Sequence, residues 1–511
     1  MKRLLVLAFV AVVLATWVLP SYAEVTFGGQ YRVRGEYRDN VNFENDNTGD
    51  NSTDNNSFYG QRTRLWGVAK PTEDVTVKIT LQDTRTWGEY YNSAGGPELT
   101  GFNATSSSTS KSTSGSSSST TCADHTFTTV PEGIPIFGGQ DVVTDPTHEC
   151  STSTSTSTST STSTSTRSSA VDLHEAYVQI DKFFGTPIDI RVGTQELNYG
   201  DQRLVGSFGW SNYGRSFDAI KLMYKSKIID ADLWTAKIKE GTYKDQDQDF
   251  YGIYTTVKAI PNNVIDLYVL LLRDGSETPM LIGSGGLTGT PNEPQNLYTA
   301  GVRIAGTFNA VDYSAELPVQ TGEINTSTNN YDIDALAFAA KLGYTFPNVM
   351  KLRLGVEYNF ASGDDDPTDT DIETFSNLFP TNHPHMGFMD QQAWRNMEAW
   401  NVNATIEPTE KLKLYVSWWN FTLDESTDAW YGAGNWMNTP TDSLRKASAS
   451  NNEDALGNEI DVVATYKYNK AVTLEAGLGV FIANDYIEQR VGTISSEEDQ
   501  EWGYLMLTAN F

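Results

Sequence analysis

The sequence has few cysteines, few histidines and no long apolar run in its body. Only 2 of its 511 residues are cysteine and 5 are histidine, which leaves few candidate general bases for an enzyme. The one continuous apolar run, at 4–18, is shorter than the roughly 20 residues that a membrane-spanning helix needs. Any passage through a membrane is therefore expected to use strands.

Basic residues are also scarce, with 36 Lys and Arg against 65 Asp and Glu and a net charge of −29. Nucleic-acid phosphates need a basic surface, so this balance excludes nucleic acid as a partner. A hydrophobic content of 39% and a mean hydropathy of −0.41 are far too polar for a helical membrane protein. A β-barrel tolerates such a composition because every second residue faces a watery lumen.

The amino terminus has the pattern of an export signal. Lys2 and Arg3 precede the apolar run 4–18, and Ser21-Tyr22-Ala23, with small residues at its first and third positions, provides a cleavage site. This pattern predicts a secretory signal peptide over 1–23, with Glu24 as the first mature residue. An uncleaved membrane anchor is the alternative.

The carboxyl terminus has the pattern of a strand, because apolar and polar residues alternate over 503–511 and end on Phe511. An open strand edge in lipid leaves backbone groups unsatisfied, so this strand is expected to pair with the alternating segment 25–38 and close a barrel. A terminal aromatic strand also resembles the tag that the bacterial barrel-assembly machinery recognises. The predicted location is the outer membrane of a Gram-negative-type bacterium, in contact with its lipids and lipopolysaccharide.

The same period of two recurs along the chain, in segments separated by Gly, Asn, Asp and Pro turns. Short turns such as 261–263, 347–348 and 469–470 contrast with long polar stretches, which is typical of outer-membrane barrels. The prediction is an all-β fold, a transmembrane antiparallel β-barrel of about 18 strands over 24–511. A soluble solenoid or propeller is the alternative, but no repeat of fixed length is present. The clearest segments are 25–38, 75–84, 188–195, 251–259, 298–308, 336–346, 352–360, 412–418, 460–468 and 472–482, with weaker patterns at 217–224 and 229–237.

One segment, 92–169, is rich in Ser, Thr and Gly and cannot bury a core, so it is predicted to be a low-complexity insertion in an extracellular loop. It contains both cysteines, Cys122 and Cys150. In an oxidising compartment a disulfide between them is favoured. A metal site with His125 and His148 is the alternative, although the spacings match no zinc pattern.

Arginines recur at strand positions whose neighbours are expected to face lipid. Facing outward near mid-membrane, each would cost about 2–4 kcal/mol, so they are predicted to line the lumen. Two interpretations stay open: the arginines brace the wall by pairing with acidic residues, or they form a constriction that holds carboxylate or sulfate groups. The arginines concerned are Arg32, Arg34, Arg62, Arg64, Arg191, Arg303 and Arg353, and Lys78, Lys221 and Lys351 are candidates to join them.

Two blocks of the sequence do not alternate and have the Gly, Pro and Asp residues of structured loops. The first runs from Gln195-Glu196-Leu197-Asn198-Tyr199-Gly200-Asp201-Gln202-Arg203 to Gly214-Arg215-Ser216-Phe217-Asp218, and the second is Ala361-Ser362-Gly363-Asp364-Asp365-Asp366-Pro367 with Leu378-Phe379-Pro380-Thr381 and His383. Both blocks resemble signature stretches of the alginate-export family of outer-membrane porins. The resemblance spans most of the mature chain.

The resemblance implies an 18-stranded monomeric barrel with inward-folded loops and a basic conduit for polyanions. The two blocks would then lie in or over the pore, which makes Arg203, Arg215, His383 and Arg395 candidates for its gate or constriction. The Ser/Thr-rich insertion and the strong acidity depart from the family, so the resemblance does not fix alginate as the substrate.

Closely spaced aspartates follow Gly363. Carboxylates among Pro and Gly turns provide the hard oxygen ligands of Ca²⁺, and Asp364, Asp366 and Asp369 are the candidate ligands. The register lacks the glycine and terminal glutamate of the helix-loop-helix calcium pattern. A solvated acidic loop without a cofactor is the alternative.

The sequence thus predicts an outer-membrane porin for small or polymeric anionic solutes, by passive or facilitated diffusion. Two other classes stay open. A barrel hydrolase would need a base such as His174, but no G-x-S-x-G nucleophile elbow is present. A surface adhesin would display the Ser/Thr-rich loop and would not require a conducting lumen.

Overall fold

The computed structural model describes residues 24–40, 56–87, 171–241, 246–276, 290–366, 368–433, 444–445, 447–448, 450–491 and 499–511. The predicted signal peptide at 1–23, the insertion at 92–169 and the pair Cys122 and Cys150 lie outside the described residues.

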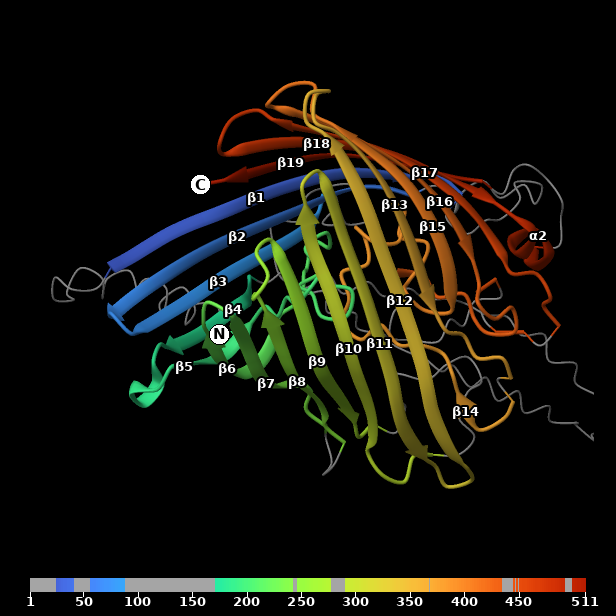
Figure 1. The fold of residues 1–511 in the computed structure, drawn as a ribbon, viewed down its shortest axis with the longest axis horizontal. Coiled ribbons are helices and arrows are strands. Elements are labelled where there is room, and N and C mark those ends of the chain that lie inside the picture. The colour runs from blue at the N-terminus through green and yellow to red at the C-terminus, as the bar shows by residue number, and fades with distance from the viewer. Residues whose placement is uncertain are drawn as a thin grey trace, which may run out of the picture. The chain divides into compact units, whose positions relative to one another are not determined.

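Nineteen strands are present in this part of the chain, and all but the two-residue β14 (Asp371–Ile372) belong to a wall of eighteen (Figure 1). The wall strands are β1 (Glu24–Arg38), β2 (Asn56–Thr72), β3 (Val75–Thr86), β4 (Asp172–Ile180), β5 (Ile188–Gln195), β6 (Phe217–Lys225), β7 (Ile229–Lys239), β8 (Gln248–Val257), β9 (Asn263–Asp274), β10 (Gln295–Phe308), β11 (Val311–Asn325), β12 (Asn330–Phe346), β13 (Leu352–Ala361), β15 (Met397–Ile406), β16 (Leu412–Thr422), β17 (Ala455–Lys467), β18 (Val472–Ala483) and β19 (Gln500–Asn510).

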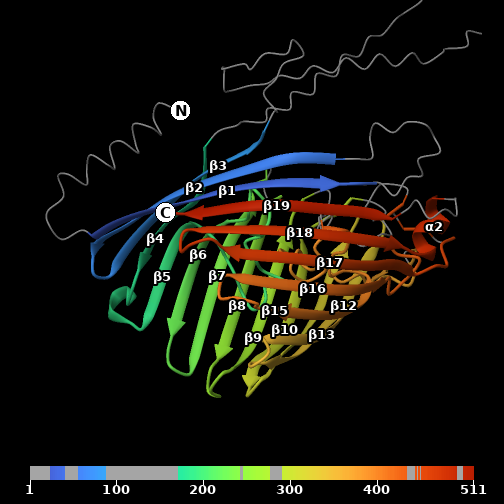
Figure 2. The same ribbon diagram turned by 90° about the horizontal axis from the view of Figure 1, so that it is seen from above.

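The wall closes on itself, because each strand pairs antiparallel with its neighbours and β1 pairs with β19 (Figure 2). At the end of this pairing, the backbone N–H of Gly29 donates to the carbonyl of Phe511 at 2.7 Å, and Phe511 N–H donates back at 3.0 Å. Gly29 leaves room for the Phe511 ring, since a Cβ at that position would lie 2.4 Å from it. The predicted antiparallel barrel and its closing pair of strands are confirmed.

The two faces of the wall differ as the period of two predicts. On β12, Leu336 and Leu342 are 44% and 52% exposed, whereas Ala335, Ala337 and Ala339 are buried. Exposed large apolar side chains recur at alternate positions around the ring and form the surface that faces lipid. Polar and charged side chains occupy the other face, which is the lumen.

Connections at the two ends of the strands have different lengths. At the end that holds Glu24 and Phe511, short turns such as 226–228 and 309–310 join the strands. At the other end the segments 196–216, 362–396 and 423–454 are much longer. This asymmetry is usual in outer-membrane barrels, whose short-turn end faces the periplasm.

Helix is rare in the described chain, where η2 (Phe183–Gly185) and α2 (Asp485–Val491) are short. None of the described helices is long and apolar enough to cross a membrane. The weak patterns at 217–224 and 229–237 correspond to β6 and β7. Strand β12 begins at Asn330 rather than Leu336. Over 330–335 the apolar residues Tyr331, Ile333 and Ala335 are buried on the inner face, and the polar residues between them are exposed.

The lipid-facing side of β18 gives a test of this arrangement. Leu478 is 67% exposed and points away from the lumen. We expect Leu478→Lys to lower the free energy of unfolding by about 2–4 kcal/mol in phospholipid vesicles, because it moves a charge into the hydrocarbon layer. Leu478→Met is the control and should change it by much less. Equal stability of the two variants, measured by denaturant titration, would contradict the assigned faces.

Candidate functional site

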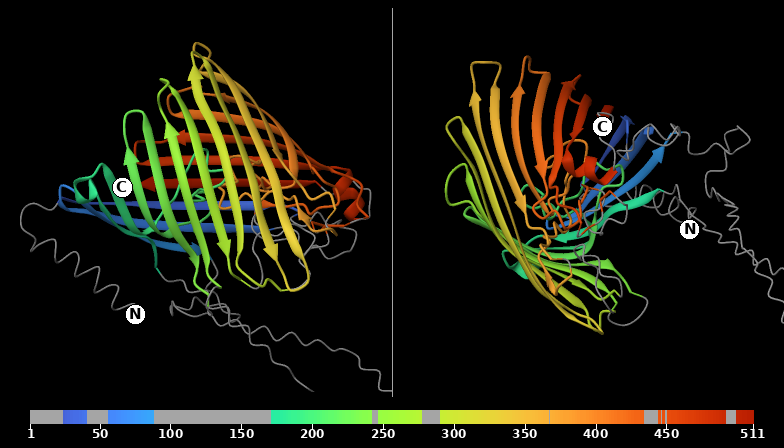
Figure 3. Two further views of the ribbon diagram at one scale, coloured as in Figure 1. Left: turned by 60° about the horizontal axis from the view of Figure 1, so that its bottom comes forward. Right: turned by 90° about the vertical axis from the view of Figure 1, so that its right-hand side faces the viewer.

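Two long segments, 196–216 between β5 and β6 and 373–396 before β15, fold into the ring of strands (Figure 3). They pair with each other, since Gly206 N–H donates to the Phe379 carbonyl at 2.9 Å and Thr381 N–H donates to the Gln202 carbonyl at 2.8 Å. Val205 and Phe379 are buried where they meet. We call these two segments the plug.

A tight turn fixes the root of the plug. Gly200 has a φ of +54°, and a Cβ there would lie 2.9 Å from the Tyr254 hydroxyl on the wall. Asn198 closes the loop from inside by accepting the Ser207 backbone N–H at 2.7 Å. Glycine therefore lets the chain reverse its direction directly against the wall.

Arginines of β1 and β2 hold the tip of the plug. Arg32 donates to the carbonyls of Gly209, Trp210 and Ser211 at 2.8–2.9 Å and to the Asn212 side chain at 2.8 Å. Arg62 donates to the carbonyls of Gly209 and Ser211 at 3.0 and 2.9 Å. These guanidinium groups thus supply donors that the irregular backbone of the tip lacks.

Arg32 and Arg62 also lie directly opposite each other in the register of β1 and β2, and each is only 5% exposed. Within the described residues neither forms an ion pair with a carboxylate, and the Nε atom of each has no hydrogen-bond partner. Arg34, by contrast, pairs with Glu36 at 2.9 Å. Two positive charges therefore lie side by side in the lumen, and among the described residues no carboxylate is in direct contact with either.

An aromatic stack joins the two segments of the plug. The guanidinium of Arg34 lies 3.8 Å from the Trp210 ring centroid, and the His383 ring stacks on Trp210 at 3.8 Å with an interplanar angle of 8°. Asp390 fixes the His383 ring through Nδ1 at 3.1 Å. The stack anchors the tip of the first segment to the second.

A second charged cluster joins the root of the plug to the wall. Arg303 pairs with Asp201 and with Asp266, the latter at 2.7 Å, and Arg203 pairs with Glu357 at 2.5 Å. Because each guanidinium has a carboxylate here, the charges are balanced.

His385 completes this cluster. Burial, with the nearby Lys341, holds the pKa of His385 well below its usual value. A neutral ring is consistent with both contacts, since Nε2–H donates to the Asp201 carbonyl at 2.6 Å and Nδ1 accepts from Lys341 at 3.2 Å.

The other predicted pore residues lie on the lumen face or in the plug, and each contacts protein groups. Their partners are Glu196 for Arg64, Gln179 and the Tyr177 ring for Arg191, the carbonyls of Gly206 and Pro380 for Arg215, Asp312 and Asn403 for Arg353, and the Tyr431 ring for Arg395. The described lumen therefore does not contain an open row of arginines without partners. Whether these residues select solutes stays a prediction.

The prediction that Lys351 lines the lumen is wrong. Lys351 lies in the turn between β12 and β13 with its side chain 66% exposed, and it pairs with Glu407 at 2.6 Å. Lys351 belongs to the turn and not to a strand, since Met350 and Lys351 both have positive φ, at 49° and 52°. The alternation therefore ends before Lys351.

Two buried carboxyl groups of β17 were missed by the sequence reasoning. Glu459 and Asp461 are fully buried on the lumen face. Glu459 accepts the Met389 backbone N–H of the plug at 2.9 Å, and Asp461 accepts the Ser417 hydroxyl at 3.1 Å. Asp461 lies within the predicted segment 460–468, so the rule that placed the arginines would have placed it in the lumen, whereas Glu459 lies one residue before that segment.

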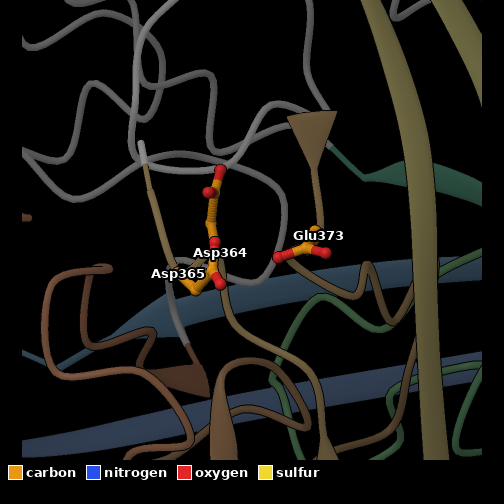
Figure 4. Close-up of side chains that lie close together, drawn as sticks. All are labelled: Asp364, Asp365 and Glu373. Atoms are coloured by element: carbon orange, nitrogen blue, oxygen red, sulfur yellow. The ribbon is translucent and has the colours of Figure 1, made fainter. Parts of the chain in front are cut away.

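The acidic loop after β13 brings together a different set from the predicted calcium ligands. Carboxylate oxygens of Asp364, Asp365 and Glu373 lie within 4.8 Å of one another (Figure 4). Asp366 and Asp369 instead accept backbone N–H groups of their own turn, at 3.1 and 2.8 Å. Calcium binding stays a prediction from the sequence.

Solved structures of other proteins share the fold of this chain. Three of the solved structures that it resembles are Pseudomonas aeruginosa OpdO (TM-score 0.52, 9% identity, covering 96% of this chain and 97% of that one), OpdL (0.52, 8%, 96% and 99%) and OccK2, or OpdF, in complex with glucuronate (0.51, 7%, 96% and 98%). At such low identity the likeness shows the fold alone, which is that of outer-membrane porins. No curated protein matches the chain.

A sequence model of one family matches residues 23–499, nearly the whole chain, and its description is alginate export. The protein belongs to this alginate-export family, as the two plug blocks predict. Family and fold together point to a channel.

The hold of Arg32 on the plug can be tested by amide hydrogen exchange. We expect Arg32→Gln to speed exchange at Phe208, Ser211 and Arg215 about tenfold or more, because hydrogen bonds from a charged donor each stabilise by about 1.5–3 kcal/mol. Arg191→Gln is the matched control, since Arg191 bonds to Gln179 on the wall and not to the plug. Unchanged exchange in Arg32→Gln would show that the plug is held elsewhere.

The acidic loop should respond to pH. Burial and the neighbouring Asp428 raise the pKa of Asp364 to about 7. The folded loop therefore keeps a proton that the unfolded chain releases near pH 4, so its stability falls as pH rises from about 4 to 7 and then levels off. Exchange at 362–366, corrected for intrinsic rates, should be faster at pH 8 than at pH 5. This difference should shrink in Asp364→Asn and persist in Asp366→Asn.

Proposed function

We propose that the protein is an outer-membrane channel through which small or polymeric anionic solutes diffuse, passively or with a binding site that facilitates passage. The observation that carries the proposal is the pair Arg32 and Arg62. They face each other in register inside the lumen and have no carboxylate partner in the described chain.

The physical argument rests on the balance of charge. Backbone carbonyls of the plug satisfy the hydrogen-bonding needs of both guanidinium groups but carry no net charge, so they leave the positive potential in place. A charged group in a narrow, low-dielectric passage raises the local concentration of the opposite ion. Guanidinium groups also bind carboxylates by two parallel hydrogen bonds, which favours organic anions and uronates.

The comparisons support the same class of solute. The family description names alginate, a polyanion, and the OccK2 structure holds glucuronate, a carboxylated sugar. Those facts belong to the family and to that protein, and they make uronates the first solutes to test here. An outer-membrane location, lipopolysaccharide contacts, insertion by the barrel-assembly machinery through Phe511 and a monomeric state are parts of the proposal.

The plug gives the proposal a mechanism for facilitated passage. Arg32 and Arg62 bind the carbonyls of Gly209 and Ser211, so an incoming carboxylate competes with the plug for the same donors. A charged acceptor forms the stronger hydrogen bond. Anions are therefore expected to loosen the tip of the plug as they pass.

The other two classes gain no support. His174, the candidate base of a hydrolase, is buried with Nε2 bonded to Glu196 at 2.8 Å, and Arg64 contacts the same carboxylate. The loop on which an adhesin would depend lies outside the described residues.

Reconstitution into planar bilayers tests the proposal. We expect an anion-selective conductance, and we expect Arg32→Gln with Arg62→Gln to lower the anion-to-cation permeability ratio several-fold, measured from reversal potentials in a salt gradient. Lys351→Gln is the control, because it removes the same charge from an exposed turn.

The outcomes separate the parts of the proposal. Absence of any conductance contradicts a channel, and a cation-selective wild type contradicts the role of the arginines. A double variant that conducts more but keeps its selectivity would mean that Arg32 and Arg62 only hold the plug.

A further inference from the structure

A cavity of about 350 Å³ lies between the root of the plug and the wall, near the short turns at the periplasmic end. Asp201 of the plug lines it on one side. Arg303 of β10, Asp312 and Ser314 of β11 and Lys341 of β12 line it from the wall. It is separate from the contact of Arg32 and Arg62 with the tip of the plug.

Small side chains create the hollow. Ala305 lies opposite Ser314 in the pairing of β10 with β11, and opposite Val264 in the pairing of β10 with β9. Three neighbouring strands thus present short lumen-facing side chains at one level, while longer polar side chains surround them. The volume is near the lower end of the range for small-molecule sites, which is about 300–1,000 Å³.

The charges around the cavity are balanced. Arg303 pairs with Asp201 and Asp266, and Arg353 binds Asp312 through two hydrogen bonds of 2.6 and 2.9 Å. A ligand with a net charge would have to break one of these pairs to gain a new one. The cavity therefore favours a neutral ligand, in contrast to the pair Arg32 and Arg62.

The spacing of the remaining polar atoms fits hydroxyl groups. Lys341 Nζ lies 4.0 Å from an Asp201 carboxylate oxygen and 3.8 Å from one of Glu357. Both distances are too long for a direct hydrogen bond. A hydroxyl oxygen about 2.8 Å from each atom of such a pair can accept from the ammonium and donate to the carboxylate. The Ser314 hydroxyl donates a long hydrogen bond to Asp201 at 3.4 Å, and its oxygen can still accept from a hydroxyl group of a ligand.

We propose that this cavity binds one neutral, hydroxyl-rich unit, a sugar ring or a polyol of similar size, at the periplasmic end of the lumen. The inference goes beyond the proposed channel for anions, because it assigns a second recognition element that reads hydroxyl groups and not charge. A hydroxylated anion would then meet the two elements at different places.

Direct binding to the full-length protein in detergent micelles tests this proposal, with D-glucose as the probe and saturation-transfer NMR as the readout. We expect glucose to bind, and Ala305→Leu to weaken its affinity at least tenfold by filling the hollow without changing any charge. Ala464→Leu is the matched control, since Ala464 lies on the lipid-facing side of β17 with Ile460 and Val462. It should leave the affinity unchanged.

Lys341→Met provides a second variant that does not depend on the hollow, and it should weaken glucose binding by a similar factor. Heat-modifiable migration in gels checks that each barrel is folded. Acetate, which has the charge without the hydroxyl groups, should not compete with glucose.

Three results would overturn the proposal: no binding of glucose to the wild type, equal binding to wild type and Ala305→Leu, or displacement of glucose by acetate. The bilayer experiments are independent of these. A channel that conducts anions but does not bind glucose refutes only this inference, whereas a barrel that binds glucose without conducting refutes only the proposed function.

Discussion

Satisfaction of the backbone in lipid is the constraint on which the rest of this structure depends. A strand edge exposed to hydrocarbon has no water to pair with, so the wall must close, and β1 closes it on β19. In the closed wall, the two faces accept different kinds of side chain. Outward positions are restricted to apolar side chains such as Leu336 and Leu478, whereas inward positions accept charge. The concentration of arginines in the lumen follows from this division of the two faces.

A buried guanidinium group still needs acceptors, and the protein supplies them in two ways. For Arg303 and Arg353 the acceptors are carboxylates, which cancel the charge. For Arg32 and Arg62 they are carbonyls of the plug, which leave the charge in place. The backbone carbonyls at the tip of the plug belong to no helix or strand that would supply their hydrogen-bond donors. The guanidinium groups of Arg32 and Arg62 on the wall have no carboxylate to accept from them among the described residues. The arginines donate hydrogen bonds to these carbonyls, and this mutual satisfaction holds the loop inside the barrel.

The sequence predicts the wall well because the period of two is a local property, and the lumen positions of seven arginines follow from the same period. It does not predict their partners. Gly209 to Ser211 are far from Arg32 in sequence and carry no side-chain signal for binding a guanidinium group. Lys341 and Asp461 could have been found by alternation within the predicted segments. Glu459 lies just before its segment, and the position of Asp201 depends on the turn at Gly200. The calcium ligands were chosen by spacing alone, yet Asp366 and Asp369 close their own turn.

The difference between the two charged clusters has a consequence for selectivity. Attraction by an uncompensated charge acts over several ångströms and discriminates poorly among anions. Hydrogen bonds to hydroxyl groups act only on contact and depend on shape. The segment 196–216 touches one cluster at its tip and the other at its root through Asp201. Under the two proposals, a solute with carboxylates at one place and neutral hydroxyl groups at another would compete for the plug at both points, whereas a chloride ion or a neutral sugar would do so at only one. Under the two proposals, a plug held at two chemically different points would respond to a combination of features that neither point detects alone.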